Sequence, residues 1–148
     1  MISFEEIRQE DVPFVSKIEE ESFSMPWKPK DFLEMISLDY AYYITAKDDG
    51  EVIGCCGIRN MCGDGEITNV VIRADRRGEG IGEKMLEFLM EESRSRGVVN
   101  YTLEVRAGNK PAIALYEKLG FVCEGVRKNF YENPTEDGLI YWKRMDNA

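Results

Sequence analysis

The clearest pattern in the chain begins at Ile67, where an apolar run gives way to glycines and then to an amphipathic segment. Val70, Val71 and Ile72 are consecutive β-branched apolar residues, which favours a buried strand. From Ile81 onward apolar residues recur at spacings of three to five, which predicts a helix with one buried face that ends near residue 96. The sequence therefore predicts a strand, a glycine-rich turn and a helix in succession.

Similar patterns predict the other elements, in the order β-α-α-β-β-β-α-β-α-β-β. Further strands are expected at residues 2–9, 40–46, 51–59, 98–105, 121–126 and 138–144, with loops at 61–65 and 127–137. The other helices are expected after Asp11, after the segment MPWKPKDF, and from Asn109 to Gly120, with Asp11 and Asn109 as N-caps. Hairpins combined with crossover helices predict an α/β fold with a mixed sheet.

The length and composition fit a single domain covering residues 1–148. Hydrophobic residues make up 43% of the chain and charged residues 32%, which is ordinary for a globular protein. The apolar runs are too short to cross a bilayer, and the acidic first ten residues do not resemble a secretory leader. We therefore expect a cytoplasmic protein that does not associate with membranes.

The net charge of −9 argues against nonspecific nucleic-acid binding, because that binding neutralises phosphates with lysine and arginine. It would favour the approach of a cationic substrate such as an amine or a basic peptide terminus. An acidic surface that serves only solubility is common among proteins, so both explanations stay open.

Two residue types restrict the chemistry. The chain has no histidine, which excludes a Ser-His-Asp or Cys-His site and leaves carboxylates, tyrosine, water or the main chain to move protons. The cysteines, Cys55, Cys56, Cys62 and Cys123, lack the spacing of metal ligands. We expect them to be small buried hydrophobic residues in a reducing compartment, and we expect no metal site.

The turn after the central strand carries Gly78, Gly80 and Gly82. A glycine-rich turn that enters a helix leaves unpaired main-chain N–H groups at the positive end of the helix dipole, which suits phosphate. The spacing matches neither the phosphate loop of nucleotide hydrolases nor the dinucleotide fingerprint. It resembles the Arg-x-x-Gly-x-Gly signature of the GCN5-related N-acetyltransferases (GNAT), carried here by Arg77, Gly80 and Gly82.

This resemblance implies a splayed mixed sheet and a turn that holds the pyrophosphate of acetyl-coenzyme A. It also implies that main-chain N–H groups of the central strand meet the oxyanion of the reaction. The cofactor residues expected from it are Val70, Val71, Ile72, Arg77, Gly78, Glu79, Gly80, Ile81, Gly82, Glu83 and Asn109. Glu79 and Glu83 stand near positions where many relatives carry a basic residue, so phosphate binding here should depend more on main-chain donors than on charge.

The stretch from Thr102 to Phe121, TLEVRAGNKPAIALYEKLGF, resembles the RimI-type branch, which acetylates the N-terminal alanine of a small-subunit ribosomal protein. The resemblance implies that Glu104 is the general base, that Tyr116 is the acid, and that Asn109 contacts the pantetheine. Two simpler roles stay open: Glu104 as a strand-end partner of Arg106, and Tyr116 as part of the apolar stripe of its helix.

The acceptor site is expected in two loops. Trp27 lies between the first two helices, either as a wall of a substrate pocket or as a plug of the core. The segment VRKNFYENPTEDGLIYW resembles the acceptor region of the RimI-type branch, with Arg127, Tyr131, Glu136 and Asp137 as matching residues and Phe130 in place of a tyrosine. The two acidic residues either bind the incoming ammonium group or cap a loop.

The expected function is acetyl-coenzyme A-dependent acetylation of a protein N-terminus, by direct attack in a ternary complex. Two alternatives remain: a GNAT enzyme that acts on lysine side chains, polyamines or another small amine, and a noncatalytic sensor of acyl-coenzyme A. The sequence leaves the acceptor protein, the effect of Phe130 and the oligomeric state open.

Overall fold

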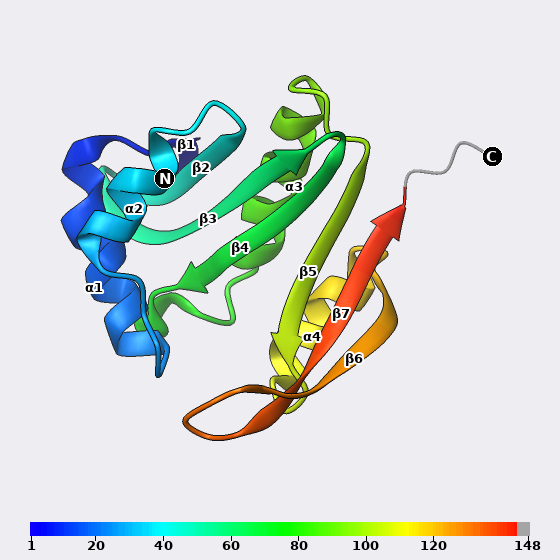
Figure 1. The fold of residues 1–148 in the computed structure, drawn as a ribbon. Coiled ribbons are helices and arrows are strands. Elements are labelled where there is room, and N and C mark those ends of the chain that lie inside the picture. The colour runs from blue at the N-terminus through cyan, green and yellow to red at the C-terminus, as the bar shows by residue number, and fades with distance from the viewer. Residues whose placement is uncertain (145–148) are drawn as a thin grey trace.

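The elements follow one another in the predicted order (Figure 1). The computed structural model describes residues 1–144. It contains β1 (Ile2–Glu6), α1 (Val12–Ser22), α2 (Pro29–Ile36), β2 (Ala41–Asp48), β3 (Glu51–Met61), β4 (Asp64–Ile72), α3 (Ile81–Arg94), β5 (Asn100–Arg106), α4 (Lys110–Lys118), β6 (Val122–Tyr131) and β7 (Glu136–Arg144). Short 3₁₀ helices at Gln9–Asp11 and Ala74–Arg76 precede α1 and α3. Within residues 1–144 no helix is both long enough and apolar enough to span a bilayer.

A single seven-stranded sheet runs in the order β1-β2-β3-β4-β5-β7-β6. Its one parallel pair among the described strands is β4 with β5, and only residues 64–66 and 100–102 are paired. Beyond these residues the two strands diverge, and Figure 1 shows them forming a V that is open at the lower end of the view. The predicted mixed and splayed sheet is confirmed.

Several element boundaries differ from the prediction. The loop expected at 61–65 is the tight turn that its glycines suggest, but it is limited to Cys62 and Gly63, whose φ angles are 57° and 99°, so β4 begins earlier than expected. The loop expected at 127–137 is mostly strand, because β6 continues to Tyr131 and β7 begins at Glu136. Most of β6 is exposed, so it lacks the alternation of buried and polar residues that reveals a strand in sequence.

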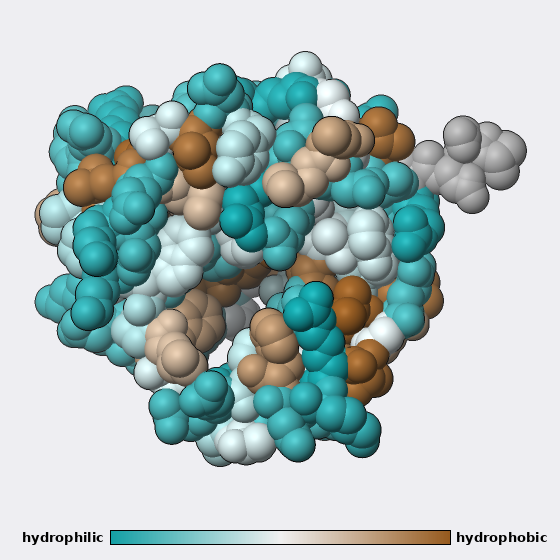
Figure 2. Space-filling view, in the orientation of Figure 1, coloured by the Kyte–Doolittle hydropathy of each residue, from teal (hydrophilic) through white to brown (hydrophobic). Residues whose placement is uncertain are grey.

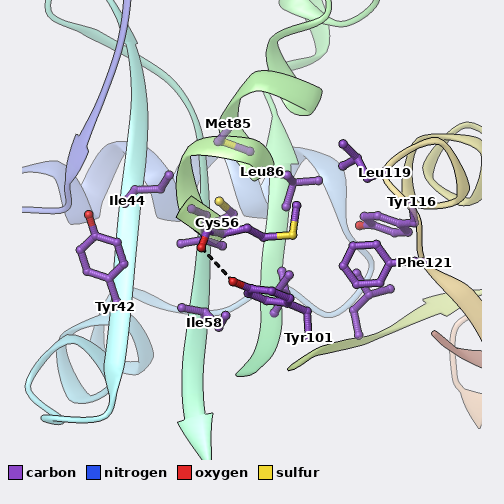
Figure 3. Close-up of a cluster of buried hydrophobic side chains, with 14 of the residues drawn as sticks. Tyr42, Ile44, Cys56, Ile58, Met85, Leu86, Tyr101, Tyr116, Leu119 and Phe121 are labelled. Atoms are coloured by element: carbon purple, nitrogen blue, oxygen red, sulfur yellow. Dashed lines mark hydrogen bonds between the residues drawn. The ribbon is translucent and has the colours of Figure 1, made fainter. Parts of the chain in front are cut away.

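Each face of the sheet carries its own hydrophobic core. On one face α1 and α2 contribute Val12, Val15, Ile18 and Phe32 to a cluster with Tyr43. On the other face the side chains of α3 and α4 pack against β2–β5 and β7 (Figure 3). The two cores confirm the predicted buried stripes of the helices, and they place the sheet between two layers of helix.

The cysteines divide into two groups. Cys55 and Cys56 are buried on opposite faces of β3, as their adjacent positions predict. Cys62 and Cys123 are exposed, so the expectation of burial was wrong for these two. Cys62 occupies the tight turn, and Cys123 lies on the edge strand β6, where little packs against it.

The two expected N-caps differ in the structure. Asn109 caps α4 as predicted, and its side chain accepts a hydrogen bond from the main-chain N–H of Ala112 at 3.3 Å. Asp11 occupies the N-cap position of α1 as predicted, but its side chain makes no capping hydrogen bond. A 3₁₀ turn precedes α1, and the Asp11 carboxylate accepts from the N–H of Arg8 at 2.9 Å and pairs with Lys47 at 3.0 Å.

Candidate active site

A cavity of about 550 Å³ fills the space where β4 and β5 diverge. Its walls come from α1, the α1–α2 loop, β4, β5, the β5–α4 loop, α4 and the β6–β7 hairpin. Figure 2 shows the surface hollowed at this place, with hydrophobic residues inside the hollow. Of the residues predicted from sequence, those lining it are Trp27, Val70, Glu104, Asn109, Tyr116, Tyr131 and Glu136.

The glycine-rich turn before α3 presents a row of unpaired main-chain amides. No described residue accepts a hydrogen bond from the N–H groups of residues 77–83. Gly78 and Gly80 both have a φ of 80°, and a Cβ at either position would meet no atom within 4 Å. Unpaired donors, free space and the N-terminus of α3 together form a cradle that fits a diphosphate.

The charged side chains around this cradle are already paired. Glu79 lies 3.2 Å from the guanidinium of Arg76, and Glu83 lies 2.9 Å from the ammonium group of Lys118. Arg77 does not reach over the turn, because its side chain donates to the carbonyl of Ile72 at 2.9 Å and to Ser22 at 3.0 Å. The main chain therefore provides the anion-binding groups of the cradle.

Glu104 presents a poorly solvated carboxylate to the cavity. Its Oε2 is buried without a hydrogen bond from any described residue, and the Nε of Arg127, 3.4 Å away, forms an ion pair with it that lacks hydrogen-bond geometry. Gly138, opposite Arg127 on β7, leaves room for this contact. Burial raises the pKa of Glu104, and the charge of Arg127 partly opposes the rise.

The alternative that Glu104 serves as a strand-end partner of Arg106 is excluded by the structure. The guanidinium of Arg106 instead donates to the carbonyls of Glu132 at 2.7 Å and Pro134 at 2.9 Å, and pairs with Glu136 at 3.3 Å. Arg106 lies at the end of β5, where the β6–β7 turn offers these acceptors. Glu104 therefore keeps a weakly paired carboxylate instead of a strand-end salt bridge.

Tyr116 projects from α4 into the α3/α4 core and is 6% exposed. Its ring packs beside that of Phe121, with the ring centroids 6.0 Å apart (Figure 3). No described residue forms a hydrogen bond with its hydroxyl group. Burial raises the pKa of Tyr116, so the side chain is a neutral phenol near neutral pH.

Glu104 and Tyr116 approach the cavity from opposite faces of the sheet. On β5 Leu103 and Val105 belong to the α3/α4 core together with Tyr116, so Glu104 between them points to the α1/α2 face. Both side chains nevertheless line the same cavity, because the gap between β4 and β5 connects the two faces. The carboxylate and the phenol can therefore act from the two sides of one substrate group.

The other predicted cofactor residues take different positions. Of Val70, Val71 and Ile72, only Val70 lines the cavity, whereas Val71 is buried in the α1/α2 core and Ile72 pairs with Gly54 of β3. Asn109 uses its carbonyl oxygen for the cap of α4. Its amide nitrogen makes no hydrogen bond with a described residue, so it can serve as a donor at the cavity.

The acceptor-side residues also separate into groups. Trp27 lines the cavity and also packs on Phe32 at 5.2 Å and Tyr43 at 6.1 Å between ring centroids, so it serves as wall and plug at once. Glu136 accepts from the N–H of Gly108, and Asp137 accepts from the N–H of Asn129 at 2.9 Å. Both carboxylates hold loops, as the capping alternative expects.

Two further aromatic residues lie beside Glu104. Tyr131 lines the cavity. Its pKa is raised mainly by burial and to a smaller extent by the nearby Glu104 carboxylate. The ring of Phe130 packs against the guanidinium of Arg127 at 5.1 Å.

Within residues 1–144 no group of three or more potential ligand side chains could hold a metal ion.

Several polar residues that were not predicted from sequence also line the cavity, and Glu19 and Asn69 are the two whose side chains bind each other. Glu19 continues the buried series of α1 after Val12 and Val15, and a carboxylate on an apolar stripe is a signal that was present in the sequence. Asn69 interrupts the apolar run of the central strand, which was also visible. Neither signal shows which groups these side chains bind.

Comparisons with known proteins agree with this geometry. A model of the acetyltransferase (GNAT) family matches residues 12–121. The chain is 38% identical, over 92% of its length and 91% of the relative, to a Bacillus subtilis (strain 168) protein provisionally named as a ribosomal protein bS18-alanine N-acetyltransferase. It is 34% identical to the Escherichia coli (strain K12) protein named for that activity, over 86% of this chain and 84% of the relative.

The structural comparison gives the same result. The crystal structure of the ribosomal-protein-S18-alanine N-acetyltransferase from Escherichia coli superposes with a TM-score of 0.91 at 29% sequence identity, covering all of this chain and 96% of the other. Both the predicted family and the predicted fold are confirmed. The chain belongs to the acetyltransferase (GNAT) family and is an N-acetyltransferase that uses acetyl-coenzyme A.

Proposed function

We propose that this enzyme acetylates the N-terminal amine of a protein, with an N-terminal alanine of a small-subunit ribosomal protein as its preferred acceptor. The observation that carries the chemistry is the meeting of Glu104 and Tyr116 in one cavity. The cradle residues 77–83 do not line this cavity, but Arg77 donates to Ser22 of its wall. The choice of acceptor is supported by relatives named for acetylation of ribosomal protein bS18 at alanine. Such an acceptor would be met in the cytoplasm, where ribosomes assemble.

Acetyl-coenzyme A supplies the thioester that carries the acetyl group. The main-chain amides of residues 77–83 would hold its diphosphate, and the amide nitrogen of Asn109 would donate to its pantetheine arm. Arg76 and Lys118 neutralise the neighbouring Glu79 and Glu83, so these carboxylates would not repel a diphosphate held by the main-chain donors. The cradle thereby fixes the depth to which the thioester enters the gap between β4 and β5.

Glu104 is the group that takes the proton from the acceptor amine. An α-amino group has a pKa of roughly 8 and an ordinary glutamate one of about 4.3, so an unshifted carboxylate would be a weak base for this proton. Burial moves the pKa of Glu104 towards that of the amine, which lowers the cost of the transfer. The amine then attacks directly, without an acetylated side chain of the enzyme.

Tyr116 faces the opposite side of the same reacting group. Its raised pKa makes complete transfer of its proton costly, so its main contribution is a hydrogen bond from the neutral phenol to the sulfur as negative charge develops there. Its hydroxyl has no competing hydrogen bond among the described residues, so this donor is available. The main-chain N–H groups near Val70 would meet the charge that develops on the carbonyl oxygen.

The acceptor would enter from the α1/α2 face, between Trp27 and the β6–β7 hairpin. Arg127 and Tyr131 stand at this entrance beside Glu104. Glu136 and Asp137 contribute by holding the loops that form it. Phe130 keeps a ring wall at the position where relatives carry a tyrosine, so we expect the slot to keep its shape and to lose one hydroxyl contact.

The acceptor class is tested with purified enzyme, acetyl-coenzyme A and a panel of amines, with products identified by mass spectrometry. The panel contains peptides that differ only in residue one, the alanine peptide with a blocked N-terminus and an internal lysine, and spermidine. We expect acetylation at the free α-amine, fastest with alanine. Preferential modification of the lysine or of spermidine would contradict the proposed acceptor, and cofactor binding without any product would indicate a sensor.

Gly80→Val should abolish tight binding of acetyl-coenzyme A, because a branched side chain would enter the space where the diphosphate sits. Gly50→Val is the matched control, since Gly50 also has a positive φ, 89°, with no atom near its Cβ, and lies in the β2–β3 turn. Both variants share a backbone cost of roughly 1–2 kcal/mol. In calorimetry we expect affinity to fall on the order of a hundredfold, about 2.7 kcal/mol, for Gly80→Val alone. Equal affinities of the two variants would reject the cradle.

Tyr116→Phe should lower kcat by about 10²- to 10³-fold while leaving the affinity for acetyl-coenzyme A nearly unchanged. Tyr101→Phe is the control, because Tyr101 is another buried tyrosine of the same core and donates to the carbonyl of Met90 at 2.8 Å. That variant should lose roughly 1 kcal/mol of stability and little activity. A Tyr116→Phe enzyme with unchanged kcat would remove Tyr116 from the chemistry.

Arg127→Ala should move the acid limb of the kcat/KM profile to higher pH. The guanidinium lowers the pKa of Glu104, so its removal raises that pKa, and the base then becomes protonated at a higher pH than in the wild type. Lys128→Ala removes an equal charge from the next residue, which pairs with Asp137 at 3.7 Å, and should leave the limb in place. An acid limb that moves to lower pH, or equally in both variants, would contradict the assignment of Glu104 as base.

A further inference from the structure

Glu19 is a buried carboxylate to which the proposed chemistry gives no role. It is 2% exposed and lines the cavity from α1. Its Oε1 accepts from the main-chain N–H of Trp27 and its Oε2 from the Nδ2 of Asn69, both at 3.0 Å, and it forms no ion pair within residues 1–144. Burial raises the pKa of Glu19, and these two hydrogen bonds oppose the rise. The carboxylate is thus fully engaged by neutral donors.

Asn69, which Glu19 contacts, has an unusual backbone. Its φ is 57°, in the left-handed region that non-glycine residues rarely occupy. The register of β4 against β3 shifts here, because Val71 pairs with Cys55 while Thr68 pairs with Gly57. Asn69 therefore lies in a β-bulge, a feature that bends a strand and often stands beside active sites.

Other contacts also hold this strained residue. The hydroxyl of Tyr43 donates to the Oδ1 of Asn69 at 3.1 Å and lies 2.6 Å from the hydroxyl of Thr68. The ring of Tyr43 lies directly over Gly57, where a Cβ would come within 2.3 Å of it. A strained conformation persists only when its surroundings hold it, and here a buried polar network does so from two sides.

The hydrogen bonds of Glu19 and Asn69 lie at the wall of the cavity. Thr68, Asn69 and Val70 line the cavity on β4 beyond the last residue that pairs with β5. Trp27 forms part of the cavity wall that comes from the α1–α2 loop. Through its two oxygens Glu19 therefore connects the strand that faces the acyl group with the loop that faces the acceptor.

We propose that Glu19 is a positioning residue for acetyl transfer: it fixes the bulge at Asn69, and thereby the adjacent main-chain donors of β4, relative to Trp27. This inference rests on the proposed function of the cavity. Glu19 acts through hydrogen bonds and its charge is not required. The structure supports this separation of hydrogen bonding from charge, because the hydroxyl of Tyr43 can accept a hydrogen bond as well as donate one. The side-chain amide of Asn69 would therefore keep both partners if its oxygen and nitrogen exchanged places.

The distinction allows a direct test. In Glu19→Gln the side-chain oxygen of the glutamine can still accept from the main-chain N–H of Trp27. If the side-chain amide of Asn69 rotates so that its oxygen and nitrogen exchange places, its oxygen can accept from the NH₂ group of the glutamine. The Asn69 nitrogen then donates to the hydroxyl of Tyr43. We therefore expect Glu19→Gln to keep kcat within about twofold of wild type, with an unchanged pH profile. Glu19→Ala and Asn69→Gly should each lower kcat on the order of 10- to 100-fold, with little change in the affinity for acetyl-coenzyme A.

Asn69→Gly removes the side-chain contacts of Asn69 without straining the backbone, because glycine adopts the left-handed conformation readily. A loss of kcat in this variant can therefore be separated from a failure to fold. Asp11→Ala is the control for loss of a buried carboxylate from the same part of the chain, since Asp11 is 4% exposed and pairs with Lys47 away from the cavity. Asp11→Ala should lower the melting temperature without lowering kcat.

Two results would overturn the proposal. If Glu19→Gln is as slow as Glu19→Ala, or shifts the pH profile, the charge of Glu19 takes part in the reaction itself. If Glu19→Ala and Asn69→Gly lower only the melting temperature and keep the wild-type kcat, the network is purely structural. Wild-type enzyme that transfers no acetyl group to any amine of the acceptor panel would instead refute the proposed function, so the two failures are distinguishable.

Discussion

The divergence of β4 from β5 is the constraint on which the rest of this structure depends. The two strands pair only at residues 64–66 and 100–102, and the gap beyond them joins the two faces of a sheet that is otherwise continuous. Each face has its own hydrophobic core and its own pair of helices, and the gap between the strands lies at the border of the α3/α4 core, whose Leu103, Val105 and Tyr116 line the cavity. A carboxylate from one face and a phenol from the other thereby reach one cavity.

The electrostatics of the cavity follow from this arrangement. Burial raises the pKa of both Glu104 and Tyr116, and within residues 1–144 neither side chain has a hydrogen-bond partner that would hold it in one role. In contrast, the charges around the glycine turn are paired with one another, so the diphosphate cradle depends on main-chain amides. In the proposed mechanism, burial therefore adjusts the acid and the base, and backbone geometry holds the cofactor.

Much of the fold could be predicted from sequence, because buried strands and amphipathic helices leave periodic patterns. The pattern failed where burial is absent, as on the edge strand β6 and at the exposed Cys62 and Cys123. The stretch from Thr102 to Phe121 identified Glu104 and Tyr116, which the structure brings to one cavity, whereas the glycines of the signature do not line that cavity. Sequence did not reveal that Arg106 pairs with the β6–β7 turn or that Glu19 reaches Asn69, because those contacts join segments that lie far apart in the chain.

A crystal structure with coenzyme A and an alanine-terminated peptide would test the central claim most directly. The account predicts diphosphate oxygens within about 2.7–3.2 Å of the main-chain nitrogens of residues 77–83. It also predicts the sulfur in the gap between β4 and β5, with the hydroxyl of Tyr116 on one side and the peptide amine beside Glu104 on the other. A diphosphate bound elsewhere, or a sulfur on one face of the sheet with access to only one of these two side chains, would contradict it.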